Sequence, residues 1–217
     1  MASLIRRIFG ARAVTPTLDA VRFDATGYDF MGEQRPGHLR VWNTPEGDQV
    51  GLLFFNVPPD LPAGASSVRE LRDYYQCMIA DSTPSGAGKL VDTNVVAAGG
   101  CLAIRTIVSV PQEPSGRAVV GSLTIPFRDF SFVLKSQALE AGLTGVKESV
   151  LLARRWATES TAQPLPGDPT WDPDAPEHDV EFPHHPVART RRVLDHLQAG
   201  LRVDEEVRRL PGFALPR

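Results

Sequence analysis

The sequence predicts an α+β fold: a predominantly antiparallel sheet of about six to seven strands flanked by helices, with a proline-rich C-terminal extension ending in a helix. Three observations predict it. Short apolar or alternating runs recur between residues 20 and 139, separated by turns rich in glycine and proline. The last four runs are joined by links too short for a parallel crossover. Two further stretches carry the period of amphipathic helices.

Three strands are expected in the first part of the chain. Residues 20–25 and 38–42 alternate apolar and polar side chains, which is typical of half-buried strands. The residues between them, including Gly27 and Gly32, favour turns. Residues 49–57 form a continuous apolar run, which is typical of a central strand covered on both faces.

A helix is expected to begin after Ser67. Ser67 and Glu70 form a capping box, in which the hydroxyl and the carboxylate accept hydrogen bonds from free backbone N–H groups. Residues 81–88 end the helix with serine, glycine and proline. An apolar stripe follows helical spacing between these points: Val68, Leu71, Tyr75, Met78 and Ile79.

Four more strands are expected at 90–97, 101–110, 118–126 and 129–139. Their short connections force successive strands to be antiparallel neighbours, so the sequence predicts a four-stranded meander. A second helix is expected to begin near Thr144. Its apolar stripe consists of Val146, Val150, Ala153 and Trp156.

The composition divides the chain into an N-terminal arm (1–17), an α+β sandwich domain (18–157), an acidic proline-rich connector (158–186) and a C-terminal helical segment (187–217). The connector holds seven prolines and seven acidic residues. Proline at that density forbids a helix, so we expect an extended connector.

The C-terminal segment is expected to open with a helix whose first turn contains Pro186. Arg189, Arg191 and Arg192 of this helix follow the acidic connector directly, so we expect the two to form ion pairs. The apolar stripe of the helix consists of Val187, Thr190, Leu194, Leu197 and Leu201.

The composition argues against nucleic acid and membrane as partners. The net charge of −3, from 23 basic and 26 acidic residues, argues against nucleic acid as a partner. Arg6 and Arg7 interrupt the apolar residues of the N-terminus, and no run approaches the ~18 apolar residues of a spanning helix. We therefore expect a cytoplasmic protein with no stable membrane insertion.

Cys77 and Cys101 are expected to be buried thiols in a reducing compartment.

The order of elements over residues 18–156 resembles the α/β/α sandwich shared by the PsbP photosystem subunit and the Ran-binding nuclear import factor. Residues 121–127 (GSLTIPF) and 140–148 (EAGLTGVKE) are similar to the final strands and helix start of bacterial domains of this kind. Those domains include adaptor chaperones of type VI secretion effectors. The resemblance implies a non-catalytic binding module.

No catalytic residue and no cofactor is expected. Residues 86–89 (GAGK) lack the earlier glycine and the following serine or threonine of a phosphate-binding loop, and they precede a strand instead of a helix. The chain contains neither a G-x-S-x-G nucleophile elbow nor a C-x-x-C pair.

Three connector histidines are the candidate metal ligands. His178, His184 and His185 lie among acidic residues, and histidines with carboxylates are the usual ligands of divalent transition metals. The alternative is a solvated acidic loop, because the prolines place these side chains on irregular backbone.

Three functions remain open, the third being a structural role in a self-assembling complex. The missing motifs and the topology favour a non-catalytic protein-binding module, such as an adaptor, chaperone or immunity-type protein of a bacterial secretion or toxin system, whose partner is another protein. The alternative is an enzyme that binds a small ligand or a metal between the sheet and the connector.

Overall fold

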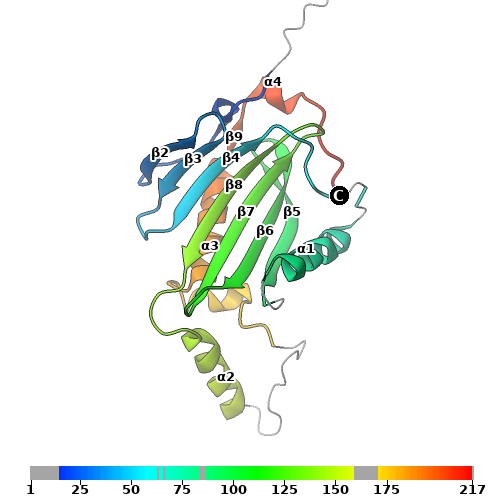
Figure 1. Cartoon of the computed structure of the whole chain (residues 1–217). Coiled ribbons are helices and arrows are strands. Elements are labelled where there is room, and N and C mark those ends of the chain that lie inside the picture. Colours follow the sequence, from blue (N-terminus) through cyan, green and yellow to red (C-terminus); the bar gives the residue numbers. More distant parts are fainter. Residues whose placement is uncertain (1–14, 63, 66, 84–86, 159–170, 217) are drawn as a thin grey trace, which may run out of the picture.

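The computed structural model describes residues 15–62, 64–65, 67–83, 87–158 and 171–216. Its main feature is a seven-stranded sheet with the order β2-β3-β4-β8-β7-β6-β5 (Figure 1). All six neighbouring pairs are antiparallel. The predicted α+β class with a predominantly antiparallel sheet is confirmed.

The strands of the main sheet are β2 (Asp29–Arg35), β3 (Leu39–Asn43), β4 (Gln49–Phe55), β5 (Lys89–Ala98), β6 (Cys101–Pro111), β7 (Arg117–Pro126) and β8 (Ser131–Leu139). The helices are α1 (Val68–Ser82), α2 (Val146–Thr158), α3 (Pro186–Gly200) and α4 (Glu205–Arg208), with short 3₁₀ turns η2 (Leu18–Ala20) and η4 (Pro176–His178). A separate two-stranded sheet pairs β1 (Val21–Arg22) with β9 (Arg202–Val203).

Helix α3 covers one face of the main sheet, lying behind the strands in Figure 1. Its apolar stripe forms one core with the strands, and Leu194 and Leu197 are fully buried there. Gly121 of β7 allows this close approach, because a Cβ atom at that position would lie 2.5 Å from Thr190 Cγ2 and 2.8 Å from Leu194 Cδ1. The final helix and the strands therefore share a single core.

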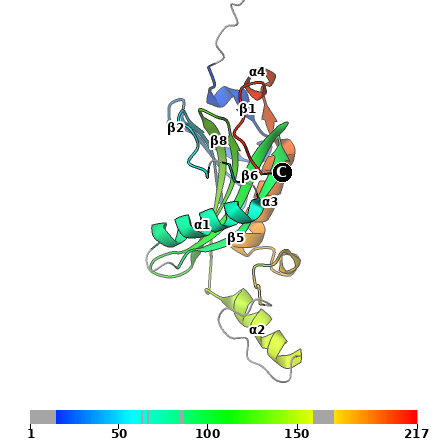
Figure 2. The same ribbon diagram turned by 90° about the vertical axis from the view of Figure 1, so that its right-hand side faces the viewer.

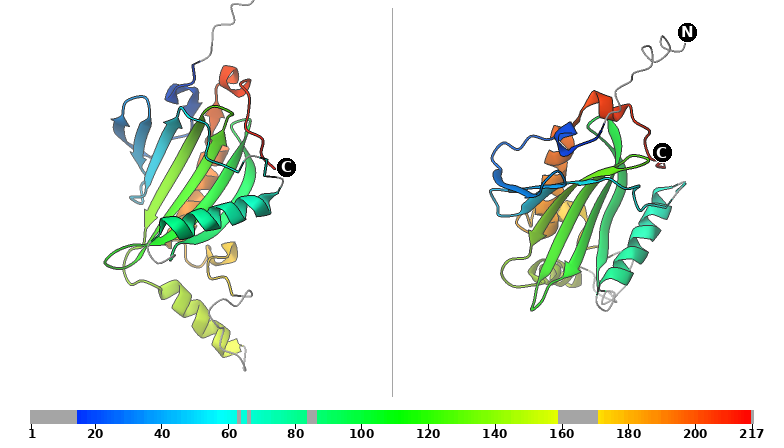
Figure 3. Two further views of the ribbon diagram at one scale, coloured as in Figure 1. Left: turned by 45° about the vertical axis from the view of Figure 1, so that its right-hand side comes forward. Right: turned by 45° about the horizontal axis from the view of Figure 1, so that its top comes forward.

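Helix α1 lies on the opposite face, toward the β5 edge of the sheet (Figure 3). Its start confirms the predicted capping box in part, since the Ser67 side chain accepts a hydrogen bond from the backbone N–H of Glu70. Leu71 and Ile79 are buried on the inner side of the helix. Leu71 and Ile104 of β6 belong to a second, smaller apolar cluster.

The four-stranded meander β5 to β8 is as predicted, but the first part of the chain differs from the prediction. Residues 20–25 do not form a strand of the main sheet, because only Val21–Arg22 is extended and it pairs with β9. The residues expected to be turns form most of edge strand β2. Nearly all of the β2 side chains are exposed, so its sequence shows no apolar alternation.

Register irregularities are confined to the edges of the sheet. Strand β2 shifts register twice along β3, and β5 shifts once along β6, between Leu90 and Asp92. The pairs formed among β3, β4, β8, β7 and β6 have continuous register.

The connector is not the extended chain that proline content predicts. Residues 171–185 form turns and the 3₁₀ turn η4, folded back by backbone hydrogen bonds such as His178 N to Ala175 O, 3.1 Å. The rest of the expected connector, 159–170, and residues 1–14 of the expected N-terminal arm lie outside the described residues.

Both cysteines are free, but Cys77 is exposed on α1 and Cys101 is half-buried, so the prediction of two buried thiols is wrong for Cys77. In the described part of the chain, every helix is too short or too polar to cross a bilayer.

Candidate functional site

A partly buried ion network forms where the connector meets the start of α2 and the beginning of β5. Asp174, in the connector, accepts hydrogen bonds from Lys147 Nζ of α2 at 3.0 Å and from Lys89 Nζ of β5 at 2.8 Å. The side chain of Lys147 is only 3% exposed. Burial favours a higher pKa for Asp174, but the two ammonium groups outweigh it and hold the pKa at about 2.

His185 joins this network at the start of α3. Its Nδ1 accepts from the backbone N–H of Val187, as the helix N-cap, and lies 3.1 Å from Lys147 Nζ. With two donors directed at Nδ1, these partners assign the ring proton to Nε2. Burial and the charge of Lys147 lower the pKa of His185 to about 4, so the imidazole is neutral at pH 7.

Two cavities lie on either side of His185. The inner cavity, of about 270 Å³, lies between the sheet, the start of α2 and the connector. Its polar lining consists of Lys89, Ser109, Arg117, Thr144, Glu148, Asp174 and His185. The outer cavity, of about 360 Å³, has an apolar wall that includes Leu143, Val146, Phe182 and Pro183.

The structure separates the predicted metal candidates. His178 lies in η4, and His184 is exposed beside the outer cavity, while His185 is mostly buried in the ion network. Among the residues that the structure describes, no group of three histidine, cysteine or acidic side chains is placed to hold a metal ion. The geometry assigns His185 to helix capping and to the wall of both cavities.

The expected pairing between connector and arginines occurs for one residue. Arg191 donates two hydrogen bonds to the carboxylate of Asp179, at 2.8 and 2.9 Å. Arg189 instead pairs with the buried Asp48 at 2.9 Å, and Arg192 pairs with Glu46. Two of the three arginines therefore tie α3 to the β3–β4 turn.

Several residues of the ion network and the inner cavity were not predicted from the sequence as site residues. Lys147 carries no local signal of burial, because a lysine in an amphipathic helix ordinarily faces solvent. Arg117 and Glu148 also lie at unremarkable positions in a strand and a helix. Only contacts between segments far apart in sequence bring them together.

Helix α2 presents a second surface of interest. It projects from the body of the molecule, at the bottom of Figures 1 and 2. Its inner side holds Lys147 and Leu151, both buried, whereas Val146 and Trp156 of the predicted apolar stripe are each 49% exposed. Leu143, just before the helix, is 83% exposed. The apolar stripe thus faces away from the protein core.

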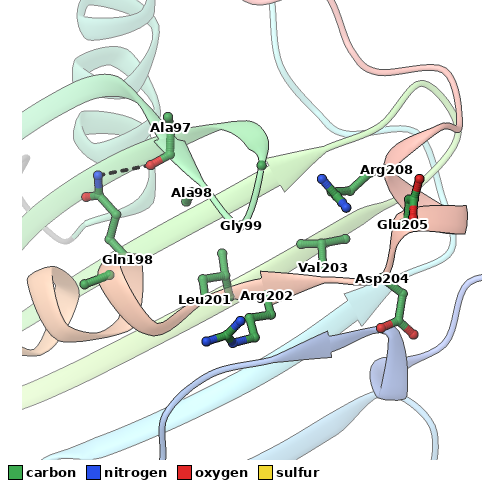
Figure 4. Close-up of a pocket in the computed structure, with 12 residues that line it drawn as sticks. Ala97, Ala98, Gly99, Gln198, Leu201, Arg202, Val203, Asp204, Glu205 and Arg208 are labelled. Atoms are coloured by element: carbon green, nitrogen blue, oxygen red, sulfur yellow. Dashed lines mark hydrogen bonds between the residues drawn. The ribbon is translucent and has the colours of Figure 1, made fainter.

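A cavity of about 540 Å³, larger than the two beside His185, lies between the β5–β6 hairpin and the segment from α3 to α4 (Figure 4). Gln198 donates a hydrogen bond to the carbonyl of Ala97 across it, at 3.2 Å. Its charged residues are all exposed: Arg202, Asp204, Glu205 and Arg208. Because no buried ionisable group faces this cavity, we place the candidate site at His185 instead.

No family profile matches the chain, and no curated protein matches it. A solved structure that is similar is the solution structure of cyanobacterial PsbP (CyanoP) from Synechocystis sp. PCC 6803, with a TM-score of 0.42 and 11% sequence identity. The match covers 88% of this chain and 90% of that chain. It is a weak, fold-level similarity to a PsbP-like fold.

Proposed function

We propose that the protein is a non-catalytic protein-binding module whose partner packs on the apolar outer surface of α2. The observation that carries the proposal is the outward orientation of the α2 stripe. An amphipathic helix normally buries its apolar side, and contiguous exposed apolar surface is characteristic of interaction sites. Here Lys147 and Leu151 face the body, whereas Val146 and Trp156 are exposed and available to a partner.

The partner that this surface fits is another protein with an apolar helix or segment. Val146 of the stripe and Leu143, just before the helix, line the outer cavity, which has room for an apolar anchor side chain from the partner. An adaptor, chaperone or immunity-type protein of a bacterial secretion or toxin system, acting in the cytoplasm, is the functional class with these properties.

Affinity capture with the full chain tests the proposal. We expect the chain to co-purify with a protein partner, and the double variant Val146→Ser/Trp156→Ser to lose it. The matched control is Met31→Ser/Leu102→Ser, which changes two residues of similar exposure, 56% and 49%, on other surfaces. Equal capture by both double variants would refute the proposed surface.

Self-association is distinguished by mass in solution. If the occupant of the α2 surface is a second copy of the chain, the wild type will be a dimer and the Val146→Ser/Trp156→Ser variant a monomer. That result would replace the partner protein with a self-assembled complex.

A further inference from the structure

The inner cavity contains two charges that the ion network leaves unpaired. Of the charged residues that line it, Lys89 and Asp174 pair with each other. Arg117 and Glu148 have no oppositely charged Lys, Arg, Asp or Glu partner within 4.0 Å among the described residues. One cation and one anion therefore face the same space without contacting each other.

Arg117 is held in place by an uncharged partner. Its Nε donates to Ser109 Oγ at 2.6 Å, and one terminal nitrogen lies 3.5 Å from the Ser109 carbonyl oxygen. These contacts fix the guanidinium, and none of these partners is a carboxylate. Arginine fixed in this way is well suited to bind a carboxylate with paired hydrogen bonds.

Glu148 and His185 also line the inner cavity. The carboxylate of Glu148 is 3.8 Å from His185 Nε2, which is too long for a hydrogen bond. Because His185 is neutral, the pair supplies one negative charge and one N–H donor to the cavity. The buried Asp174–Lys147 pair behind them holds both elements in position.

We propose that the inner cavity binds a small zwitterion of the α-amino acid type. Its carboxylate would contact Arg117 and the Nε2–H of His185, and its ammonium group would contact Glu148. The volume of about 270 Å³ corresponds to about nine water molecules at ~30 Å³ each, which is room for a small amino acid.

The proposal is tested with serine, alanine and glycine as probes, together with propionate and ethylamine, which carry only one of the two charges. Binding stabilises the native state, so we expect at least one amino acid at ~10 mM to raise the melting temperature, and neither propionate nor ethylamine to do so. Isothermal titration then measures the dissociation constant. No shift with any amino acid, or an equal shift with propionate, would overturn the proposal.

Two conservative variants locate the site. Arg117→Gln and Glu148→Gln should each weaken amino-acid binding at least tenfold while melting cooperatively without ligand. Arg117→Lys is the control for a folding defect. It retains the positive charge and should bind the amino acid more tightly than Arg117→Gln does. The control Glu177→Gln changes an exposed connector carboxylate and should bind as the wild type does. Wild-type affinity in both Gln variants would refute this site.

This proposal is independent of the partner surface on α2. The Val146→Ser/Trp156→Ser variant should bind the amino acid normally, so loss of the protein partner and loss of the small ligand are separable results.

Discussion

Helices α3 and α2 are both amphipathic, but the apolar stripe of α3 is buried and that of α2 is largely exposed. In α3, Leu194 and Leu197 are completely buried against the sheet. In α2, Val146 and Trp156 are half exposed. Both stripes are visible in the sequence at the same helical spacing. The pattern therefore predicts a helix, but it does not predict which surface will cover its apolar side.

The difference arises from the position of each helix relative to the sheet. Helix α3 crosses the middle strands, where Gly121 leaves room for its side chains. Helix α2 begins after β8 has ended, beyond the lower edge of the sheet in Figure 1. Leu151 is buried on its inner side, and three polar contacts also attach it: the buried Lys147–Asp174 pair, the exposed Arg154–Glu181 pair, and Arg155 over the ring of Trp171 at 5.8 Å.

The largest effect should come from truncating the stripe of α3. Leu194→Ala removes a fully buried side chain, so we expect the free energy of unfolding to fall by about 4 kcal/mol in denaturant titrations. A loss below 1 kcal/mol would mean that α3 is no better packed than α2, and the contrast between the two helices would disappear.

The second effect concerns the polar attachment of α2. Asp174→Asn leaves Lys147 buried without its counter-charge, so we expect a loss of about 3 kcal/mol. Hydrogen exchange would show whether this loss is global or confined to the amides of α2. If neither stability nor exchange changes, the ion network does not anchor the helix.

A third effect is a pH dependence that involves His185. Its pKa is about 4 in the folded protein and about 6.5 when unfolded, so between these values the unfolded chain binds the extra proton. The free energy of unfolding should therefore be unaffected by His185 above pH 6.5 and should fall as the pH falls toward 4. Denaturant titrations across this range should show the slope, and His185→Gln should reduce it. His184→Gln, at the exposed neighbour, should retain it.

The smallest effect should come from the stripe of α2. Val146→Ser replaces a half-exposed side chain, so we expect stability to change by less than about 0.5 kcal/mol. A loss approaching that of Leu194→Ala would show that part of the chain already covers this surface.

Local patterns predicted much of the fold. The Ser67 cap, the β5 to β8 meander and the start of α3 at Pro186 each depend on neighbouring residues, and each is observed. Strand β2 was missed because an edge strand with exposed side chains on both faces has no periodic apolar signal. Its pairing with β3 supplies the hydrogen bonds instead.

The candidate site was less predictable. Asp174 belongs to an acidic segment that suggested solvation, yet it is 8% exposed and holds two lysines. Its partner Lys147 lies 27 residues earlier in the chain, and Lys89 lies 85 residues earlier. Long-range ion pairs of this kind have no local sequence signature, because each side chain is unexceptional until the fold brings the others to it.

The bulges in the outer strands affect how easily another chain can pair with the edges of the sheet. An outermost strand exposes a row of unsatisfied N–H and C=O groups that can recruit a strand from another chain. Both outermost strands here interrupt that row with an extra residue, β2 twice and β5 once, so an incoming strand cannot pair in register along the whole length. The bulges at both sides of the sheet therefore disfavour growth of the ladder from molecule to molecule.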